Sequence, residues 1–270
     1  MPKASEIEDI KKLRLMLYSV AGGGKTTFFR SLPGKKFLFM FDPAGLCAIQ
    51  KIDDIEFETF IPENQNIAIS TNKGSTNSPV SYSGSDMYLQ YEKFINEKIE
   101  EDFFSQFSWV GFDSITSLQN LEFDQVANIY GREGRIPQLE DHNTVGDALL
   151  KNIRLWSSLP CNICIMAHEK ANQDKLMRTI GMDIMVPGQF SKKLCLLLSD
   201  IYHLRAVREG KEVVYYADIA PTEEYSLARC SLELDPTVNV TIPRNVGDVT
   251  EYGFGRILRD KGYYNESKKE

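Results

Sequence analysis

A glycine-rich turn between an apolar run and a helical pattern is the feature that most constrains the fold of this chain. Residues 13–19, LRLMLYS, are typical of a buried strand, and residues 25–32 carry a helical pattern that ends before Pro33 and Gly34. Three glycines, residues 22–24, lie between them. Small residues let backbone N–H groups curve around an anion, and the N-terminus of the following helix adds partial positive charge. The segment therefore predicts a strand–loop–helix unit built to bind phosphate.

The alternation of apolar runs and helical patterns continues along the chain. Apolar runs recur at residues 36–42, 55–61, 107–113 and 161–168, and helical spacing recurs at 86–104, 115–130 and 144–157. Near-continuous apolar runs are typical of parallel strands covered on both faces; the run at 55–61 has the more exposed character. The pattern predicts an α/β fold with a mostly parallel sheet flanked by helices.

The C-terminal third predicts antiparallel additions to that sheet. Residues 200–207 and 212–219 alternate in polarity around Glu209-Gly210, which predicts a β-hairpin. We expect an edge strand within 236–246, a short helix near 248–260 and a charged tail at 261–270. Residues 62–85 are rich in Asn, Ser, Thr and Gly and predict a loop or a small insertion. Without a repeat or a clear linker, the chain is interpreted as one domain over residues 1–270.

Composition excludes several classes of protein. The 270 residues carry a net charge of −7, which excludes a uniformly basic nucleic-acid coat. No apolar stretch approaches the length of ~20 residues that spans a bilayer, and the polar N-terminus does not resemble a signal peptide. Five cysteines, an odd number, favour a reducing compartment, so we expect a cytoplasmic protein. Cys161 and Cys164 form a C-x-x-C within an apolar run; buried core is the favoured interpretation, with redox or zinc chemistry as alternatives.

The glycine-rich segment matches most of the phosphate-loop pattern G-x-x-x-x-G-K-[ST]. Gly24, Lys25 and Thr26 fit, whereas Ser19 stands where the pattern has its first glycine. We expect Lys25 to reach the β- and γ-phosphates of ATP and the Thr26 hydroxyl to ligate Mg²⁺. The residues predicted to bind the nucleotide are Ala21, Gly22, Gly23, Gly24, Lys25, Thr26 and Thr27.

Two aspartates end apolar runs that should reach the same edge of the sheet. Asp113, followed by Ser114, lies where a second carboxylate for Mg²⁺ is expected. Ser114 has an alternative role as the cap of the next helix. Asp42 ends the neighbouring run, and ligands of open α/β sheets bind at the carboxyl ends of strands. Asp42 would orient the attacking water or act as a base; a turn before Pro43 is the alternative.

His168 and Glu169 form a polar pair after the apolar run at 161–168. Their place at the same sheet edge predicts that His168 hydrogen-bonds the γ-phosphate and senses hydrolysis. A structural histidine is the alternative. The other two histidines, His142 and His203, share no ligand-like spacing with it, which disfavours a metal site.

Taken in order, these motifs resemble the core of the RecA-type ATPases. The resemblance rests on residues 19–27, Asp42, Asp113-Ser114 and the run His168-Glu169-Lys170, and it covers about residues 13–235. The greatest likeness is to short, phage-encoded, core-only RecA-like ATPases linked to single-strand annealing and recombination. It implies that Asp113 supports Mg²⁺ and that His168 couples the nucleotide to DNA.

The resemblance also implies two DNA loops and a shared site. Residues 131–147 take the place of the first DNA-binding loop and residues 169–193 that of the second. The segment Leu227-Ala228-Arg229 resembles the late strand from which relatives send a finger into the neighbouring site. Arg229 would then stabilise transition-state charge across a subunit interface, which implies self-association.

The chain departs from the RecA-like pattern at three places. Relatives usually carry Asp-x-Glu after the second strand, with the glutamate as catalytic base, whereas this chain has Asp42-Pro43-Ala44. Hydrolysis would then be slow, or Asp42 or Glu169 would substitute. Leu227 replaces the lysine of a common Lys-x-Arg. The domain that recombinases add outside the core is missing, so full strand exchange is not expected.

Residues 169–193 predict a basic, mobile loop that gives way to a helix. Five basic residues there exceed the three acidic ones, and the basic set is Lys170, Lys175, Arg178, Lys192 and Lys193. Phosphate contacts from such a loop would give salt-dependent binding of single-stranded DNA without sequence preference. No aromatic side chain is interleaved among them, and Phe190 lies only at the edge, so base stacking is not expected. The alternative is a solvated lysine-rich loop.

The main hypothesis is a Mg²⁺- and ATP-dependent RecA-like ATPase that acts with single-stranded DNA in phage recombination, annealing or replication. It would work in the cytoplasm of a bacterial host, with a single-strand binding protein as a further partner. An alternative is a nucleotide-gated interaction or loader module that hydrolyses ATP poorly and is not coupled to DNA. A nucleoside or small-molecule kinase is disfavoured, because residues 169–193 hold a single arginine rather than an arginine-rich lid.

Overall fold

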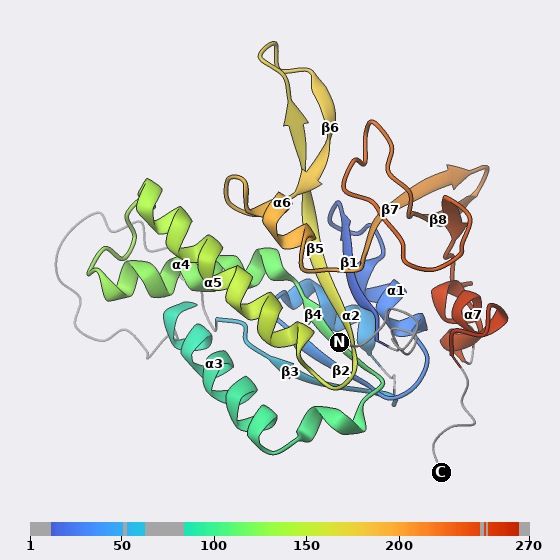
Figure 1. The fold of residues 1–270 in the computed structure, drawn as a ribbon, viewed down its shortest axis with the longest axis horizontal. Helices are drawn as coiled ribbons and strands as arrows, with labels where there is room; N and C mark the ends of the chain where they lie inside the picture. The colour runs from blue at the N-terminus through green and yellow to red at the C-terminus, as the bar shows by residue number, and fades with distance from the viewer. Residues whose placement is uncertain (1–11, 51–52, 63–83, 244–245, 247, 265–270) are drawn as a thin grey trace, which may run out of the picture.

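The computed structural model describes residues 12–50, 53–62, 84–243, 246 and 248–264 (Figure 1). The predicted loop at 62–85 lies outside the described residues except at its ends. The same holds for most of the predicted tail at 261–270.

Within the described residues, nine strands form one mixed sheet around which the helices pack (Figure 1). Eight of them lie in the order β3-β2-β4-β5-β1-β7-β8-β9, and β6 pairs with β5 alone. The first six strands of this order, β3, β2, β4, β5, β1 and β7, are parallel to one another. Strands β6, β8 and β9 are antiparallel to their neighbours. The fold class predicted from the sequence is confirmed. The strands are β1 (Arg14–Ser19), β2 (Lys36–Met40), β3 (Ile55–Thr59), β4 (Trp109–Asp113), β5 (Asn162–Gln173), β6 (Thr179–Ile184), β7 (Asp200–Glu209), β8 (Glu212–Asp218) and β9 (Thr237–Asn239).

Helices cover both faces of the sheet. They are α1 (Lys25–Ser31), α2 (Leu46–Ile49), α3 (Gly84–Glu100), α4 (Ile115–Ile129), α5 (Leu139–Ser157), α6 (Phe190–Cys195) and α7 (Gly253–Asp260). Because successive residues of a strand point to opposite faces, β1 feeds two cores. Leu15 and Leu17 pack into one core with residues of α1 and α7, whereas Met16 and Tyr18 pack into the other with residues of α3, α4 and α5.

The two cysteines of the C-x-x-C confirm the interpretation of β5 as a buried strand. Cys161 and Cys164 are both buried and unbridged, and they belong to the two different cores. Burial raises the pKa of the Cys161 thiol to about 11, which keeps it protonated and unreactive. Among the described residues, no group of three or more His, Cys, Asp or Glu side chains could hold a metal ion.

The parallel strands bring several chain segments to one edge of the sheet. Ser19 at the end of β1 is in register with His168 of β5, and Asp113 at the end of β4 is in register with Met166. Met40 of β2 is in turn in register with Asp113, so Asp42 follows at the same edge. These side chains come from segments far apart in the sequence, and the sheet alone places them together.

The prediction of a mobile loop at 169–193 was wrong for its first half. Strand β5 continues to Gln173, and β6 returns antiparallel to it, so that a hairpin projects from the sheet (Figure 1). Asp174 stabilises the turn, because its Oδ1 accepts hydrogen bonds from the backbone N–H groups of Leu176 and Arg178. The β5 half of this hairpin, residues 169–173, is polar and therefore lacks the apolar signal of a core strand, whereas Met182 and Ile184 of β6 pack on the core. The predicted helix follows as α6.

Two other boundaries also differ from expectation. Helix α5 begins at Leu139 rather than 144, with a capping box formed by Gln138 and Asp141. The predicted first DNA loop at 131–147 is therefore helical over its second half. The expected edge strand at 236–246 is reduced to β9.

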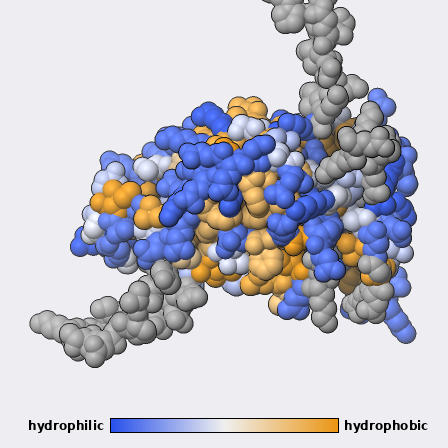
Figure 2. All heavy atoms as spheres, turned by 90° about the horizontal axis from the view of Figure 1, so that it is seen from below, coloured by the Kyte–Doolittle hydropathy of each residue, from blue (hydrophilic) through white to orange (hydrophobic). Residues whose placement is uncertain are grey.

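Among the described residues, no helix is long and apolar enough to cross a membrane. Hydrophilic and hydrophobic side chains are interspersed over the face of the molecule that is seen from below (Figure 2).

Candidate active site

The phosphate loop joins β1 to α1 through a turn that only glycine fits. Gly22 and Gly24 have φ values of 76° and 92°, in the left-handed region that glycine adopts without steric cost. Gly23 is required for a different reason: a Cβ at this position would overlap the side chain of Ser19. Helix α1 begins directly afterwards at Lys25, so its N-terminal N–H groups face the loop.

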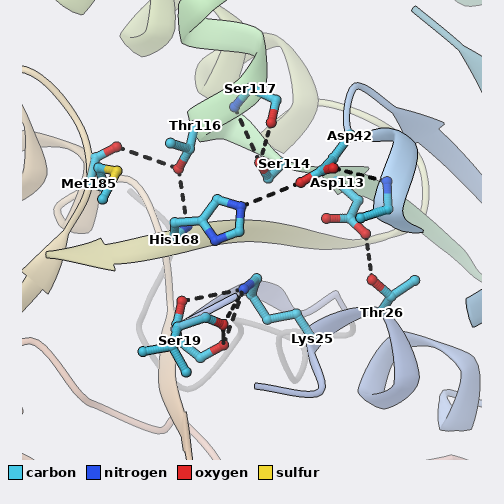
Figure 3. A network of polar contacts seen from close by, with 12 residues as sticks. Ser19, Lys25, Thr26, Asp42, Asp113, Ser114, Thr116, Ser117, His168 and Met185 are labelled. Carbon is cyan, nitrogen blue, oxygen red and sulfur yellow. Dashed lines mark hydrogen bonds and ion pairs between the residues drawn. The ribbon is translucent and has the colours of Figure 1, made fainter. Parts of the chain in front are cut away.

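The conformation of Ser19 shows why this chain needs no glycine at the first position of the phosphate-loop pattern. This residue closes β1, paired with His168 of β5, and it has no positive φ that would call for glycine. Its hydroxyl instead accepts a hydrogen bond from Lys25 Nζ at 3.1 Å (Figure 3). The Ser19 and Val20 carbonyl oxygens accept from the same ammonium group at 3.3 and 3.1 Å.

Lys25 is therefore a buried ammonium held by three oxygens of the loop itself. Only 6% of the residue is exposed, and this burial lowers the pKa of Lys25 against the opposing effect of Asp113 and Asp42. A desolvated cation with only neutral oxygens as hydrogen-bond acceptors gains most from an anion brought close to it. The loop thus offers a charged group to a phosphate without exposing it to water.

Thr26 and Asp113 form the second part of the site. The Thr26 hydroxyl donates to Asp113 Oδ2 at 2.6 Å (Figure 3). Asp113 is almost fully buried at the end of β4, and burial raises its pKa even though Thr26 and Lys25 act in the other direction. A hydroxyl and a carboxylate are oxygen ligands that suit Mg²⁺, which takes its remaining ligands from phosphate oxygens and water. The donor set therefore fits the predicted metal.

Asp42 and His168 form a pair in the wall of the site. The His168 Nε2 and Asp42 Oδ2 atoms are 3.5 Å apart (Figure 3). The other Asp42 oxygen accepts from the Ala44 N–H at 3.1 Å, so this residue both caps a turn and faces the site. The hydrogen bond from His168 lowers the pKa of Asp42, which favours the carboxylate. Asp42 therefore stabilises the turn at Pro43 and also lines the site.

His168 is held in place through its backbone. Its N–H donates to the Thr116 hydroxyl at 3.0 Å, and that hydroxyl donates to the Met185 carbonyl at 3.4 Å (Figure 3). Helix α4 and the segment after β6 therefore both contact the strand that carries His168. Ser114 takes the predicted capping role, because its side chain accepts from the Ser117 N–H at the start of α4.

A cavity of about 240 Å³ opens between these groups. It brings together all of the predicted phosphate-binding residues, and Asp42, Asp113 and His168 with them. The full lining is Ala21, Gly22, Gly23, Gly24, Lys25, Thr26, Thr27, Asp42, Ala44, Gly45, Ala48, Asp113, His168 and Tyr215. Tyr215 of β8 was missed, because nothing in the sequence indicates that the C-terminal hairpin reaches the phosphate loop.

Glu169 lies away from this cavity. Its neighbour His168 points toward the phosphate loop, and the alternation of β5 turns Glu169 to the other face of the sheet. There its Oε2 is 2.7 Å from His203 Nε2, and the His203 ring stacks on Tyr225 with ring centroids 3.8 Å apart. The structure therefore engages Glu169 elsewhere, which leaves Asp42 as the acidic candidate for orienting water.

Arg229 also lies apart from the chain's own cavity. Its backbone bridges to Ile201 of β7, and its guanidinium donates to the Leu198 carbonyl. Because Leu198 precedes β7, this contact lies at the opposite edge of the sheet from the phosphate loop. A role of Arg229 in the site of a neighbouring copy stays a prediction.

The predicted DNA-binding residues divide into engaged and exposed groups. Lys170 donates to the Val186 carbonyl at 2.8 Å, and Arg178 pairs with Asp174 at 2.6 Å. Lys175 is exposed at the tip of the β5–β6 hairpin. Lys192 and Lys193 are exposed on α6.

We expect Gly23→Ala to destabilise the protein by about 1–3 kcal/mol, the usual cost of overpacking a filled site. The added methyl group would meet the Ser19 side chain. The free energy of unfolding in urea measures the effect. If the clash is the cause, the double variant Ser19→Gly with Gly23→Ala recovers much of the loss relative to Ser19→Gly alone. Equal losses in the two backgrounds would contradict this explanation.

Comparison with known proteins agrees with this geometry. A family model described as an AAA domain matches residues 11–221, more than three quarters of the chain. The match includes the phosphate loop, Asp42, Asp113 and His168, and it ends just after β8. The comparison with curated proteins found no match. The chain therefore belongs to the AAA domain family and carries a P-loop ATPase-type domain.

Proposed function

We propose that this protein is a Mg²⁺-dependent, RecA-like ATPase that acts with single-stranded DNA in phage recombination, annealing or replication. One observation carries the enzymatic part. A single cavity at the ends of β1, β2 and β4 gathers a buried ammonium, a hydroxyl–carboxylate pair and a second carboxylate. Phosphoryl transfer needs little covalent chemistry from a protein, and depends on positioning and on charge stabilisation.

Each group has a distinct task in the proposed reaction. The N–H groups of the loop and Lys25 bind the phosphates, and Lys25 exchanges its carbonyl acceptors for phosphate oxygens. Thr26 and Asp113 hold Mg²⁺, which when bound neutralises charge on the β- and γ-phosphates. Asp42 orients the attacking water and accepts its hydrogen bond, because its low pKa keeps it ionised. His168 positions Asp42.

The coupling to DNA rests on the continuity of β5. His168 faces the cavity, and five residues later the same strand ends in the projecting hairpin that bears Lys175 (Figure 1). A contact at the hairpin thus acts on the strand that positions Asp42. Lys192 and Lys193 of α6 follow the hairpin in the chain and add exposed positive charge. Arg178 contributes less, because Asp174 neutralises it.

The proposal is tested by steady-state ATP hydrolysis with Mg²⁺, with and without single-stranded DNA, at low and moderate salt. Single-stranded DNA is expected to stimulate turnover, and the stimulation should fade as salt rises. The triple variant Lys175→Glu, Lys192→Glu, Lys193→Glu should keep basal turnover and lose the stimulation. The slope of log affinity against log salt should become shallower by roughly 0.7 for each phosphate contact removed.

A triple variant with the same change of charge serves as the control. Lys151, Lys211 and Lys261 are exposed lysines on α5, the β7–β8 turn and the end of α7. Changing these three to glutamate should leave the stimulation by DNA intact. Equal losses in both triple variants would show that net charge alone matters and would contradict a DNA site on the hairpin.

The second candidate is a nucleotide-gated interaction module that hydrolyses ATP slowly. Ala44 lines the cavity where RecA-like relatives carry the catalytic glutamate, and this observation favours it. The same experiment separates the two functions. ATP binding without stimulation by DNA at either salt concentration would support the module and refute the coupling to DNA.

A further inference from the structure

A second, narrower opening adjoins the phosphate loop on the side away from the acidic groups. It has a volume of about 30 Å³, room for very few water molecules. The lining consists of Gly23, Gly24, Thr27, Phe28, Leu204, Tyr215, Val240 and Ile242. Gly23, Gly24, Thr27 and Tyr215 line both openings, and among these four Tyr215 is the residue with a large side chain. This opening is called the apolar slot below.

The sheet order places the apolar slot on the side of β1 opposite to the strands that carry the acidic groups. Strands β4 and β2, which lead to Asp113 and Asp42, lie on one side of β1, whereas β7 and β8 lie on the other. A phosphate loop holds the β- and γ-phosphates at its lysine and its Mg²⁺ ligand. If the γ-phosphate lies near Lys25 and Asp113, the α-phosphate and the sugar would extend toward Thr27 and β8, and the base would reach Tyr215.

The chemistry of the apolar slot suits a flat, largely apolar ring. Leu204 and Val240 are buried, Ile242 is partly buried, and no charged side chain of the described residues lines the slot. Tyr215 contributes an aromatic face, and aromatic faces stack on any nucleobase because every base has a π-face. Besides the Tyr215 hydroxyl, Thr27 supplies the polar side chain of the lining. Binding here would therefore depend on stacking and burial rather than on hydrogen bonds to base edges.

Tyr215 packs directly on the phosphate loop. Its ring carbons lie 3.0 and 3.1 Å from the position that a Cβ on Gly24 would occupy. The backbone of Tyr215 is fixed at both ends: its N–H donates to the Thr241 hydroxyl at 2.8 Å, and its carbonyl accepts from the Val240 N–H at 2.9 Å. A base can therefore enter only when the ring rotates about its side-chain bonds, while β8 stays in place.

We propose that the apolar slot is the nucleobase subsite of this protein and that Tyr215 is its stacking platform, which turns away from Gly24 as the base enters. This inference rests on the proposed nucleotide-binding function. A subsite of this kind accepts either purine, since it reads ring area rather than the pattern of donors and acceptors. ATP and GTP are therefore expected to bind within a few-fold of each other, and CTP more weakly.

The test compares nucleotides with a ligand that has the phosphates and lacks the base. Affinities for ATP, GTP, CTP and inorganic tripolyphosphate, each with Mg²⁺, are measured by calorimetry for the wild type, Tyr215→Ala and Tyr215→Phe. Tyr215→Ala should lose about tenfold or more in affinity for ATP and GTP, the range of one base–aromatic stack, and keep its affinity for tripolyphosphate. Tyr215→Phe should bind all four ligands as the wild type does.

Tyr216→Ala is the matched control. Tyr216 is the next residue of β8, and its hydroxyl donates to Glu209 at 2.8 Å while its ring lies under Arg205. It faces away from the apolar slot, so its loss should leave every affinity unchanged.

The outcomes separate this inference from the proposed function. Unchanged ATP affinity in Tyr215→Ala, or an equal loss for ATP and tripolyphosphate, would overturn the subsite and leave the phosphate loop intact. A wild type that binds neither ATP nor tripolyphosphate would refute the proposed function itself. If Tyr215→Ala does not fold, the affinities of the wild type decide. The inference would be overturned if the wild type bound tripolyphosphate as tightly as ATP. It would also be overturned if the wild type bound CTP as tightly as GTP.

Discussion

Replacing Lys25 with alanine is expected to lower kcat/KM for ATP hydrolysis by about 10²–10³-fold or more, the usual loss when one charge-stabilising donor is removed. Lys25 is the buried cation of the cavity, and no other lysine or arginine of the described residues lines it. ATP affinity should fall as well, because the phosphates lose their charged partner. Steady-state hydrolysis and calorimetric binding measure the two effects separately.

The same substitution should not weaken the fold. Burial lowers the pKa of Lys25, which means that the folded state tolerates its charge less well than water does. Removing the ammonium relieves that cost, so the melting temperature of Lys25→Ala should equal or exceed that of the wild type. An inactive variant with a lower melting temperature would indicate misfolding rather than loss of a catalytic group.

Lys35→Ala is the matched control for Lys25→Ala. Lys35 is exposed, precedes β2 at the far edge of the sheet and pairs with Glu56 at 2.7 Å. Its loss should leave hydrolysis unchanged. If Lys25→Ala hydrolyses ATP as fast as Lys35→Ala does, the cavity is not the site of hydrolysis.

The predictable part of the site is the part that local sequence determines. Residues 22–27 take their conformation from glycines and from the start of α1, so their pattern is visible in the sequence. Asp42, Asp113 and His168 were predictable for a different reason. Each follows an apolar run, and parallel strands bring their carboxyl ends to one edge, so the strand type alone implies proximity.

The missed part depends on contacts between distant segments. Tyr215 reaches Gly24 only because β7 pairs with β1 and β8 pairs with β7, and no local pattern encodes that order. Glu169 looked equivalent to His168 in sequence, yet the pleat of β5 turns it toward His203. The β5–β6 hairpin was predicted to be a loop because its first strand is polar beyond His168; backbone pairing with β6, which packs Met182 and Ile184 on the core, makes it a strand.

Asp113→Asn is expected to reduce hydrolysis by about 10²-fold or more, while the site keeps its shape. An asparagine side chain has the size of the aspartate, and its carbonyl oxygen still accepts the hydrogen bond from Thr26 that measures 2.6 Å. What it loses is the negative charge that would attract Mg²⁺. Titration of hydrolysis with Mg²⁺ should therefore show a higher half-saturating concentration, in addition to the lower rate.

The same substitution, Asp113→Asn, should raise the stability of the fold although it lowers the hydrolysis rate. Burial raises the pKa of Asp113 above its ordinary value of 3.8, so the folded protein binds this proton more tightly than the unfolded chain does. Above that raised pKa the ionised carboxylate therefore reduces the free energy of unfolding. A neutral asparagine side chain at this position would carry no such cost, and with a chelator present at pH 7 the variant should melt at a higher temperature than the wild type. The difference should shrink as the pH falls toward 4.

Asp147→Asn separates this effect from a general change of charge. Asp147 is an exposed residue of α5, and its replacement should change neither the hydrolysis rate nor the pH dependence of melting. A gain in melting temperature for Asp113→Asn alone, together with its loss of hydrolysis, would mean that the fold bears a cost in stability to keep a buried carboxylate at the cavity. A variant that loses both activity and stability would instead make Asp113 a structural residue, and the Mg²⁺ site would have to be sought elsewhere.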